Sequence, residues 1–182
     1  VNHLRAIHVT THMSLRKALD FIKTERILET IRFGQQALTE LGINRQRIAV
    51  AGLNPHASEG GLFGTEELDQ ITPAIELASS EGVDIHGPIP PDTVFHRMNK
   101  SEFDLVIALY HDQGHIPLKL IGFDSGVNIT VGLPIIRTSV DHGTAFDIAG
   151  QLKANSASML KAIQLAKVMA NAQNLDKTRL VN

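Results

Sequence analysis

The chain has 182 residues, of which 43% are hydrophobic, and a formal net charge of −2. This length suits one domain or one lobe of a larger subunit, and the charge excludes the basic surface that nucleic-acid binding requires. The absence of cysteine excludes disulfides and thiolate metal sites. We find neither an apolar run that could span a membrane nor a signal-peptide pattern, so we expect a cytoplasmic protein without nucleic-acid or membrane partners.

Extended and helical patterns alternate along the chain. Strands are expected at 4–10, 47–53, 83–90, 104–110 and, around a Gly-Leu-Pro turn, within 126–140. Helices are expected at 15–22, from residue 24 to the closing Gly42, at 65–80 and 91–98, and finally around 159–170. Their expected N-caps include Ser14, Thr24 and Asp92. Strands that alternate with helices indicate an α/β fold, and the absence of a linker or repeat indicates a single α/β region over 1–182.

Histidines follow three of the expected strands. His12 comes after 4–10, His56 after 47–53 and His111 after 104–110. Ligands in open α/β sheets gather outside the carboxyl ends of the strands, so parallel neighbouring strands would bring these imidazoles to one edge. Three neutral imidazoles form a catalytic site for zinc or a similar divalent ion. A single strand-end histidine more often bonds backbone or water, but three at equivalent positions favour the metal site.

Other residues near His111 have more than one interpretation. Asp112 either binds metal, orients an imidazole or caps the N-terminus of a helix. His115 is either a partner of the metal ligands or an ordinary residue at a helix start. Four other histidines lack a comparable setting and are expected to be surface or strand residues: His3, His8, His86 and His96.

Lys119, Asn128 and Arg137 interrupt apolar segments. A lone Lys or Arg in such a segment usually extends its charge to solvent. Two cations and an amide near a metal would instead suit a phosphate and a carboxylate, and spacing does not decide between these interpretations. The glycine-rich segment 56–64 likewise either holds an anion or is a mobile surface loop. Neither standard nucleotide fingerprint occurs.

The segment DHGTAFDIAG, at 141–150, is the last dense polar cluster. Gly143 and Thr144 would allow a ligand to approach the backbone closely, and Asp147 suits a ribose diol. A helix capped by an Asp after a glycine turn explains the same pattern equally well.

Five motifs in order carry a resemblance to a known family: TTH, GLNPHASEGG, YHDQGH, GVNITVGLPIIRTSVDHGTA and DIAG. Together they closely resemble the 4-hydroxythreonine-4-phosphate dehydrogenase family over about residues 6–170. The resemblance implies an isocitrate/isopropylmalate dehydrogenase-like fold, whose members carry a similar HGSAPDIAG stretch at the cofactor site. It also implies that this chain, which starts at Val1, is a fragment corresponding to the C-terminal half of a two-domain subunit.

The resemblance further implies roles for particular residues. It implies metal ligands at His12, His56 and His111, and substrate contacts at Lys119, Asn128 and Arg137. It implies an NAD adenosine site at His142, Gly143, Thr144, Ala145 and Asp147, with Asn155 as a further adenine contact. The metal would be zinc or another divalent ion such as Mg, Co or Mn, and Asp147 favours NAD over NADP. Family members are homodimers whose active sites draw residues from both subunits.

The implied reaction is the metal- and NAD-dependent oxidation of the C3 hydroxyl of a 4-phosphorylated hydroxy acid, followed by decarboxylation. The stretches GHIPLKL and GTAFDIAG look more like the branch that acts on 4-phospho-D-threonate or 4-phospho-D-erythronate than the branch for 4-phosphohydroxy-L-threonine in pyridoxine biosynthesis. His115 is then a candidate marker of that branch. No general base is evident in the chain, so it would come from the other half or from a second subunit.

Two other functions remain open at this stage. A metal-dependent hydrolase would use the same three histidines to activate water, but it would leave DHGTAFDIAG unexplained. A non-catalytic dimerisation fragment would bind a second copy without turnover, and this chain alone is expected to be inactive.

Overall fold

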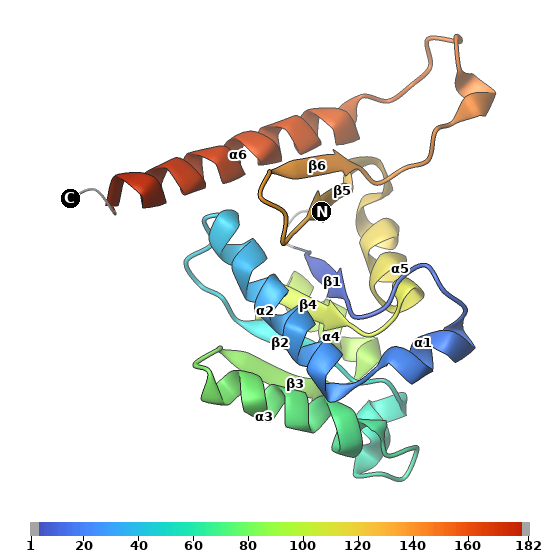
Figure 1. Ribbon diagram of the computed structural model, residues 1–182. Helices are drawn as coiled ribbons and strands as arrows, with labels where there is room; N and C mark the ends of the chain where they lie inside the picture. Colours follow the sequence, from blue (N-terminus) through green and yellow to red (C-terminus); the bar gives the residue numbers. More distant parts are fainter. Residues whose placement is uncertain (1–3, 180–182) are drawn as a thin grey trace.

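The computed structural model describes residues 4–179, with side chains for residues 4–172. The main sheet contains β1 (Ala6–His8), β2 (Ile48–Ala51), β3 (Ile85–Ile89) and β4 (Leu105–Ala108), in the order β1-β4-β2-β3. All of its pairings are parallel, so the carboxyl ends of these strands lie at one edge. A separate antiparallel hairpin pairs β5 (Val127–Thr130) with β6 (Arg137–Val140) (Figure 1).

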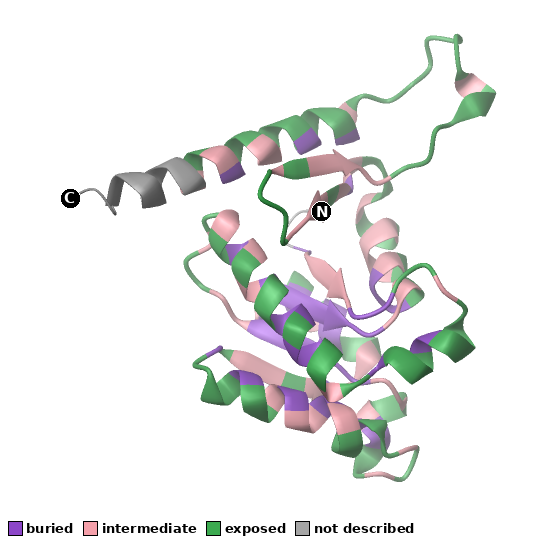
Figure 2. Ribbon diagram, viewed as in Figure 1, coloured by how far each residue is buried: buried purple, intermediate pink, exposed green. Residues whose placement is uncertain are grey.

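Helices cover both faces of the main sheet. On one face lie α2 (Thr24–Glu40) and α3 (Thr72–Ser80), and on the other lies α4 (Pro91–Asn99). The central strands β2 and β4 are buried throughout, and their alternate side chains enter the two layers (Figure 2). Ile107 of β4 faces α2, for example, whereas its neighbour Val106 faces α4. The sheet therefore has a complete core on each side, which makes it a stable support for groups at its edge.

Most of the predicted elements are confirmed with shifted ends, but two predicted caps are wrong. Ser14 does cap α1 (Leu15–Phe21), because its hydroxyl accepts a hydrogen bond from the Lys17 N–H. Thr24 instead lies inside α2, where its N–H is satisfied by the Gln70 side chain from the neighbouring helical segment. Asp92 lies in the first turn of α4, which starts at Pro91.

The helix predicted at 65–80 is divided. A π-helical turn at Glu67–Ile71 precedes α3, and the Thr72 N–H bonds the carbonyl of Glu67 five residues earlier. Pro73 explains the division, because it has no N–H to donate in the first turn of α3.

A further helix, α5 (His111–Gly122), starts at His111 with Tyr110 at the capping position. The interpretation of Asp112 as an N-cap is therefore wrong. The last helix, α6 (Ala157–Arg179), lies across the β5–β6 hairpin and extends past it (Figure 1).

The apolar side chains of α6 are buried only in part. Ala162 and Met169 are buried, whereas Met159 and Ile163 are 50% and 59% exposed. A two-stranded hairpin covers a narrower stripe of a helix than a full sheet does. Within the described part of the chain, no helix is both long enough and apolar enough to cross a membrane.

Candidate metal and substrate site

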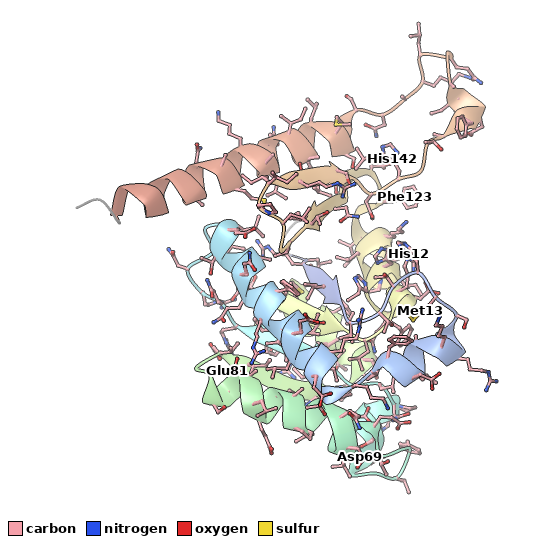
Figure 3. The ribbon with its side chains drawn as sticks, viewed as in Figure 1. His12, Met13, Asp69, Glu81, Phe123 and His142 are labelled. Atoms are coloured by element: carbon pink, nitrogen blue, oxygen red, sulfur yellow. The ribbon has the colours of Figure 1, made fainter. Side chains whose placement is uncertain are left out.

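The sheet order brings His12 and His111 together. β1 pairs with β4, and the pairing continues past both strands, because the Thr10 N–H bonds the Leu109 carbonyl at 3.2 Å. The loop after β1 and the start of α5 therefore leave the sheet side by side. The ring centroids of His12 and His111 are 5.8 Å apart, and Figure 3 shows His12 on its loop next to α5. The two residues line a cavity of about 290 Å³.

Asp112 orients the His111 ring. The His111 Nδ1 lies 2.6 Å from Asp112 Oδ1, a distance typical of a strong charge-assisted hydrogen bond. A carboxylate that accepts the Nδ1–H leaves the lone pair on Nε2, which is the arrangement usual for a metal-binding imidazole. Of the interpretations left open for Asp112, the geometry favours orientation of His111.

His56 is carried by a segment in an unusual backbone conformation. Four consecutive non-glycine residues have left-handed φ values, which are 53°, 52°, 66° and 47° for His56, Ala57, Ser58 and Glu59. Such a conformation costs roughly 1–2 kcal/mol per residue, and strain of this kind gathers at functional sites. The sequence gives no sign of it, because glycine, which adopts this conformation freely, is absent until Gly60.

A buried carboxylate anchors the residues that lead into this strained segment. Glu67 is 1% exposed, and its Oε1 accepts hydrogen bonds from the N–H groups of Leu53 and Asn54 at 2.7 and 2.6 Å. Its Oε2 accepts a third bond, at 2.8 Å, from the Asn54 side chain. Gly52 packs against the same segment, since a Cβ there would lie 2.9 Å from the Ala57 Cα. Sequence reasoning treated Glu67 only as a helix-opening residue and missed this role.

His56 itself does not join His12 and His111 within one chain. Its side chain is 66% exposed, and it contacts Glu59 and Phe63 of its own segment. Among the described residues, no three His, Cys, Asp or Glu side chains are grouped so that they could hold a metal ion. One chain thus assembles two of the three expected ligands, and the three-histidine metal site stays a prediction.

A second imidazole pair lies behind His111. His8 Nε2 and His115 Nδ1 are 3.1 Å apart, and the His115 ring centroid is 4.1 Å from that of His111. Burial, together with His115 and His111, lowers the pKa of His8 to about 4. Burial also lowers the pKa of His115. Both rings are therefore neutral at pH 7. The sequence did not indicate the contact between His8 and His115, because the two residues are 107 positions apart. His3, which was expected to be a surface or strand residue, lies outside the described residues.

A larger cavity of about 900 Å³ separates β1 and α5 from β5 and α6. Its lining includes residues from both groups of predicted ligands: His12, His111 and Lys119 from the side of β1 and α5, and Asn128 from β5. Arg137 does not line it and is exposed on β6, where its Nη1 donates to Thr130 Oγ1 at 2.8 Å. The structure therefore brings together four of the six predicted metal and substrate residues, and leaves His56 and Arg137 outside.

The predicted cofactor residues lie on one exposed loop beyond β6, and Figure 3 labels His142 at its start. His142 Nδ1 donates to the Gly143 carbonyl at 2.9 Å, and Asn155 Oδ1 accepts the Ala157 N–H at the start of α6. The alternative of an Asp-capped helix is wrong, because Asp147 lies inside a short 3-10 turn that has no side-chain cap. None of the predicted cofactor residues, Thr144 and Ala145 included, lines either of the two cavities described above. Their role in binding the cofactor therefore stays a prediction.

Comparison with known proteins identifies the family. Residues 1–166 match the family of the pyridoxal phosphate biosynthetic protein PdxA. This chain belongs to the PdxA family. It is 56% identical, over 167 residues, to the D-threonate 4-phosphate dehydrogenase of Salmonella typhimurium, covering 92% of this chain and 51% of that protein. It is 50% identical, over 171 residues, to the 4-hydroxythreonine-4-phosphate dehydrogenase of Bradyrhizobium diazoefficiens, covering 93% of this chain and 50% of that protein.

Solved structures in the PdxA family confirm the predicted fold. A crystal structure of 4-hydroxythreonine-4-phosphate dehydrogenase from Klebsiella pneumoniae is similar with a TM-score of 0.85 and 54% identity, covering 93% of this chain and 51% of that chain. A terephthalate 1,2-cis-dihydrodioldehydrogenase from Burkholderia xenovorans is similar with a TM-score of 0.75 and 36% identity, covering 91% and 53%. The fold is the predicted isocitrate/isopropylmalate dehydrogenase-like α/β fold, and the chain spans about half the length of these relatives.

Proposed function

We propose that the whole protein oxidises the C3 hydroxyl of a 4-phosphorylated hydroxy acid, with NAD as hydride acceptor and a divalent metal ion, and that CO2 is then lost from C1. The proposal depends most on the shared cavity, whose lining includes His12 and His111 together with the substrate-binding candidates Lys119 and Asn128. The relative at 56% identity is named a D-threonate 4-phosphate dehydrogenase, which favours 4-phospho-D-threonate or 4-phospho-D-erythronate over 4-phosphohydroxy-L-threonine.

The donor set fits a divalent ion. His12 and His111 supply two imidazoles with ring centroids 5.8 Å apart, and Asp112 orients one of them. Imidazole ligands suit zinc and also other divalent ions, so the ligand set alone does not select the metal. When bound, the ion would supply Lewis acidity that lowers the pKa of the substrate hydroxyl. The residues of this chain would hold the ion and orient its ligands.

We propose that His56 of a second copy completes each site in a homodimer. His56 is exposed, yet its backbone is strained and held by Glu67, which is the arrangement of a residue prepared for a ligand outside its own chain. Exposed apolar side chains flank both halves of the site: Leu62 and Leu68 near His56, and Leu15 beside the His12 cavity. In a two-fold dimer the same contact forms twice, so both sites are completed together.

The charged substrate groups would be bound by residues of α5 and the hairpin. Arg137 lies outside the larger cavity, on β6, and its planar guanidinium would suit two-point binding of the phosphate or the carboxylate. Lys119 lines that cavity and would supply a second positive charge. Asn128 adds an amide in the same cavity. The adenosine part of NAD would lie against the exposed 142–155 loop, whose residues would bind and orient it.

The test is turnover by the full-length protein, with NADH formation measured by absorbance. Rapid NADH formation from 4-phospho-D-threonate or 4-phospho-D-erythronate is expected, with slower reaction of 4-phosphohydroxy-L-threonine and none after metal removal by a chelator. Release of inorganic phosphate without NADH formation would instead support a metal-dependent hydrolase and contradict the proposal.

A further inference from the structure

A buried polar side chain in α5 connects two strand ends that lead to predicted metal ligands. Gln113 is 9% exposed, and its side-chain amide makes two hydrogen bonds to the backbone. Its Oε1 accepts the Leu109 N–H at 2.7 Å, and its Nε2 donates to the Gly52 carbonyl at 2.8 Å. Leu109 comes two residues before His111. Gly52 comes four residues before His56, so one amide contacts both of the segments that lead to these histidines.

The amide lies where the direct pairing of β2 with β4 ends. The last residues paired directly are Val50 and Ile107, and the same register extended by two residues places Gly52 opposite Leu109. At that level the Gln113 amide lies between the two backbones. Its oxygen faces one backbone and its NH2 group faces the other, as a peptide group of an interposed strand would. The amide therefore sets the separation of the two strand ends beyond the paired residues.

The same side chain closes the turn that contains His111. Gln113 is the third residue of α5, and the Leu109 N–H that it accepts lies just before the helix. The arrangement resembles a capping box, in which the side chain of the third helical residue accepts a backbone N–H from the residue that precedes the helix. His111 lies between the two bonded residues. Asp112 orients the His111 ring, whereas Gln113 fixes the backbone from which that ring extends.

The third strand end joins the same set of bonds through Leu109. Thr10 is 1% exposed, and both its N–H and its Oγ1 donate to the Leu109 carbonyl, at 3.2 and 2.8 Å. Thr10 comes two residues before His12. Removal of one partner from a buried hydrogen bond leaves the other unsatisfied at a cost in free energy. These buried bonds therefore favour one arrangement of the three strand ends.

We propose that Gln113 is a positioning residue for the metal site, because it holds the strand ends that lead to His111 and His56 in one fixed arrangement. The inference rests on the proposed function. In the homodimer proposed above, His111 and His56 of one chain belong to two different sites, so a single Gln113 acts on both. Residues that position metal ligands without touching the metal typically contribute about 10- to 100-fold to metal affinity.

The first test uses hydrogen exchange in the full-length protein without metal. Mass spectrometry follows the exchange of peptides that cover residues 50–59 and 105–115. Gln113→Met keeps the length of the side chain but removes both hydrogen bonds, and it is expected to speed exchange in both segments roughly 10-fold. Faster exchange in 105–115 alone would mean that Gln113 acts only on its own helix, and it would overturn the inference.

Two control variants separate positioning from general stability. Gln36→Met removes an exposed side-chain hydrogen bond to Glu40 on α2 and is expected to leave the exchange of both segments unchanged. Ile48→Val shortens a fully buried side chain at the amino end of β2. It is expected to destabilise the fold without a change in metal affinity, because it lies at the opposite end of the strand from the site.

The second test measures Co²⁺ binding to the full-length protein by visible absorption, which reports the geometry of the metal ligands. His111→Ala is expected to abolish the absorption band, which assigns the band to the site. Gln113→Met is expected to weaken Co²⁺ binding roughly 10- to 100-fold and to shift the band. Gln113→Glu keeps an acceptor for the Leu109 N–H and is expected to lie between wild type and Gln113→Met. Gln36→Met and Ile48→Val are expected to bind as the wild type does.

The outcomes distinguish the inference from the proposed function. Wild-type affinity and spectrum in both Gln113 variants, or an equal loss of affinity in Ile48→Val, would overturn the inference and leave the proposed function standing. A wild-type protein that gives no His111-dependent Co²⁺ band would contradict the metal site of the proposed function, and the inference with it.

Discussion

The four-stranded sheet and the C-terminal hairpin with α6 differ in how completely they are covered. β2 and β4 are buried on both faces, whereas the C-terminal region exposes large apolar side chains from the hairpin to the helix. These include Leu133, Ile135, Phe146, Leu152 and Ile163. The predicted metal ligands His12 and His111 are therefore supported by a sheet that is packed on both faces. Arg137 and the 142–155 loop lie instead on elements that expose apolar side chains.

The largest expected effect separates the two regions directly. Ile107→Ala, at the centre of the sheet, is expected to lower the free energy of unfolding by about 2–5 kcal/mol, because it leaves a cavity in a packed core. Ile163→Ala, on the exposed side of α6, is expected to cost less than about 0.5 kcal/mol in this chain. Urea unfolding of the two variants measures the difference. Equal losses of stability in the two variants would contradict the difference in burial between the sheet and α6. A larger loss for Ile163→Ala in the full-length protein than in this chain would show that the full-length protein covers the Ile163 side chain.

The next effect concerns pH at the edge of the sheet. The pKa of His8 is lowered to about 4, whereas in the unfolded chain it returns to its ordinary value of 6.5. The unfolded chain therefore binds the proton more readily, and the native state loses stability as the pH falls from 6.5 toward 4, by up to about 3 kcal/mol. His8→Leu in metal-free protein is expected to show a shallower decline over this range, measured by urea unfolding at several pH values. The same decline in wild type and variant would assign the pH dependence to other groups.

A smaller effect is expected where the strained segment meets the sheet. Glu67→Gln is expected to lower the free energy of unfolding by about 1–3 kcal/mol. The buried carboxylate accepts three hydrogen bonds, and glutamine has an NH2 group in place of one of the two oxygens, so at least one of these bonds is lost. Glu76→Gln, at an exposed position of α3, serves as the control. Thermal unfolding compares the two. Equal effects would mean that Glu67 does not hold the His56 segment.

The smallest effect tests the strain itself. Ala57→Gly is expected to stabilise the chain by about 0.5–1 kcal/mol, because Ala57 has a φ of 52° that glycine adopts freely. A destabilised variant would indicate that the left-handed turn is supported by contacts of the Ala57 methyl group.

The sequence was sufficient for the parts of the fold that depend on local patterns. The alternation of strands and helices predicted the α/β class, and the position of His111 directly after β4 predicted its place at the sheet edge. The order of the strands in the sheet could not be derived from the sequence. The prediction that His12 lies close to His111 therefore depended on the assumption that their strands are parallel neighbours. The resemblance supplied most of the residue roles, which composition and spacing had left open.

What the sequence did not reveal depends on long-range contacts. His8 appeared ordinary because His115 meets it only after α5 folds back over β1. The left-handed turn at His56 was hidden because no glycine marks it, and the residues that lead into it are held by Glu67, which is eleven positions beyond His56. The apolar side chains of the last helix follow helical spacing, yet Met159 and Ile163 are largely exposed, because periodicity shows only that a helix has an apolar face. It does not show what covers that face.

The central claim is that each active site combines His12 and His111 of one subunit with His56 of the other. The most direct measurement mixes full-length His56→Ala and His111→Ala proteins, each inactive alone, after exchange of subunits. Random exchange makes half of the dimers mixed, and each mixed dimer has one intact site of two, so about a quarter of wild-type NADH formation should return. Recovery near this level supports the shared site. No recovery, when subunit exchange is verified independently, would contradict it.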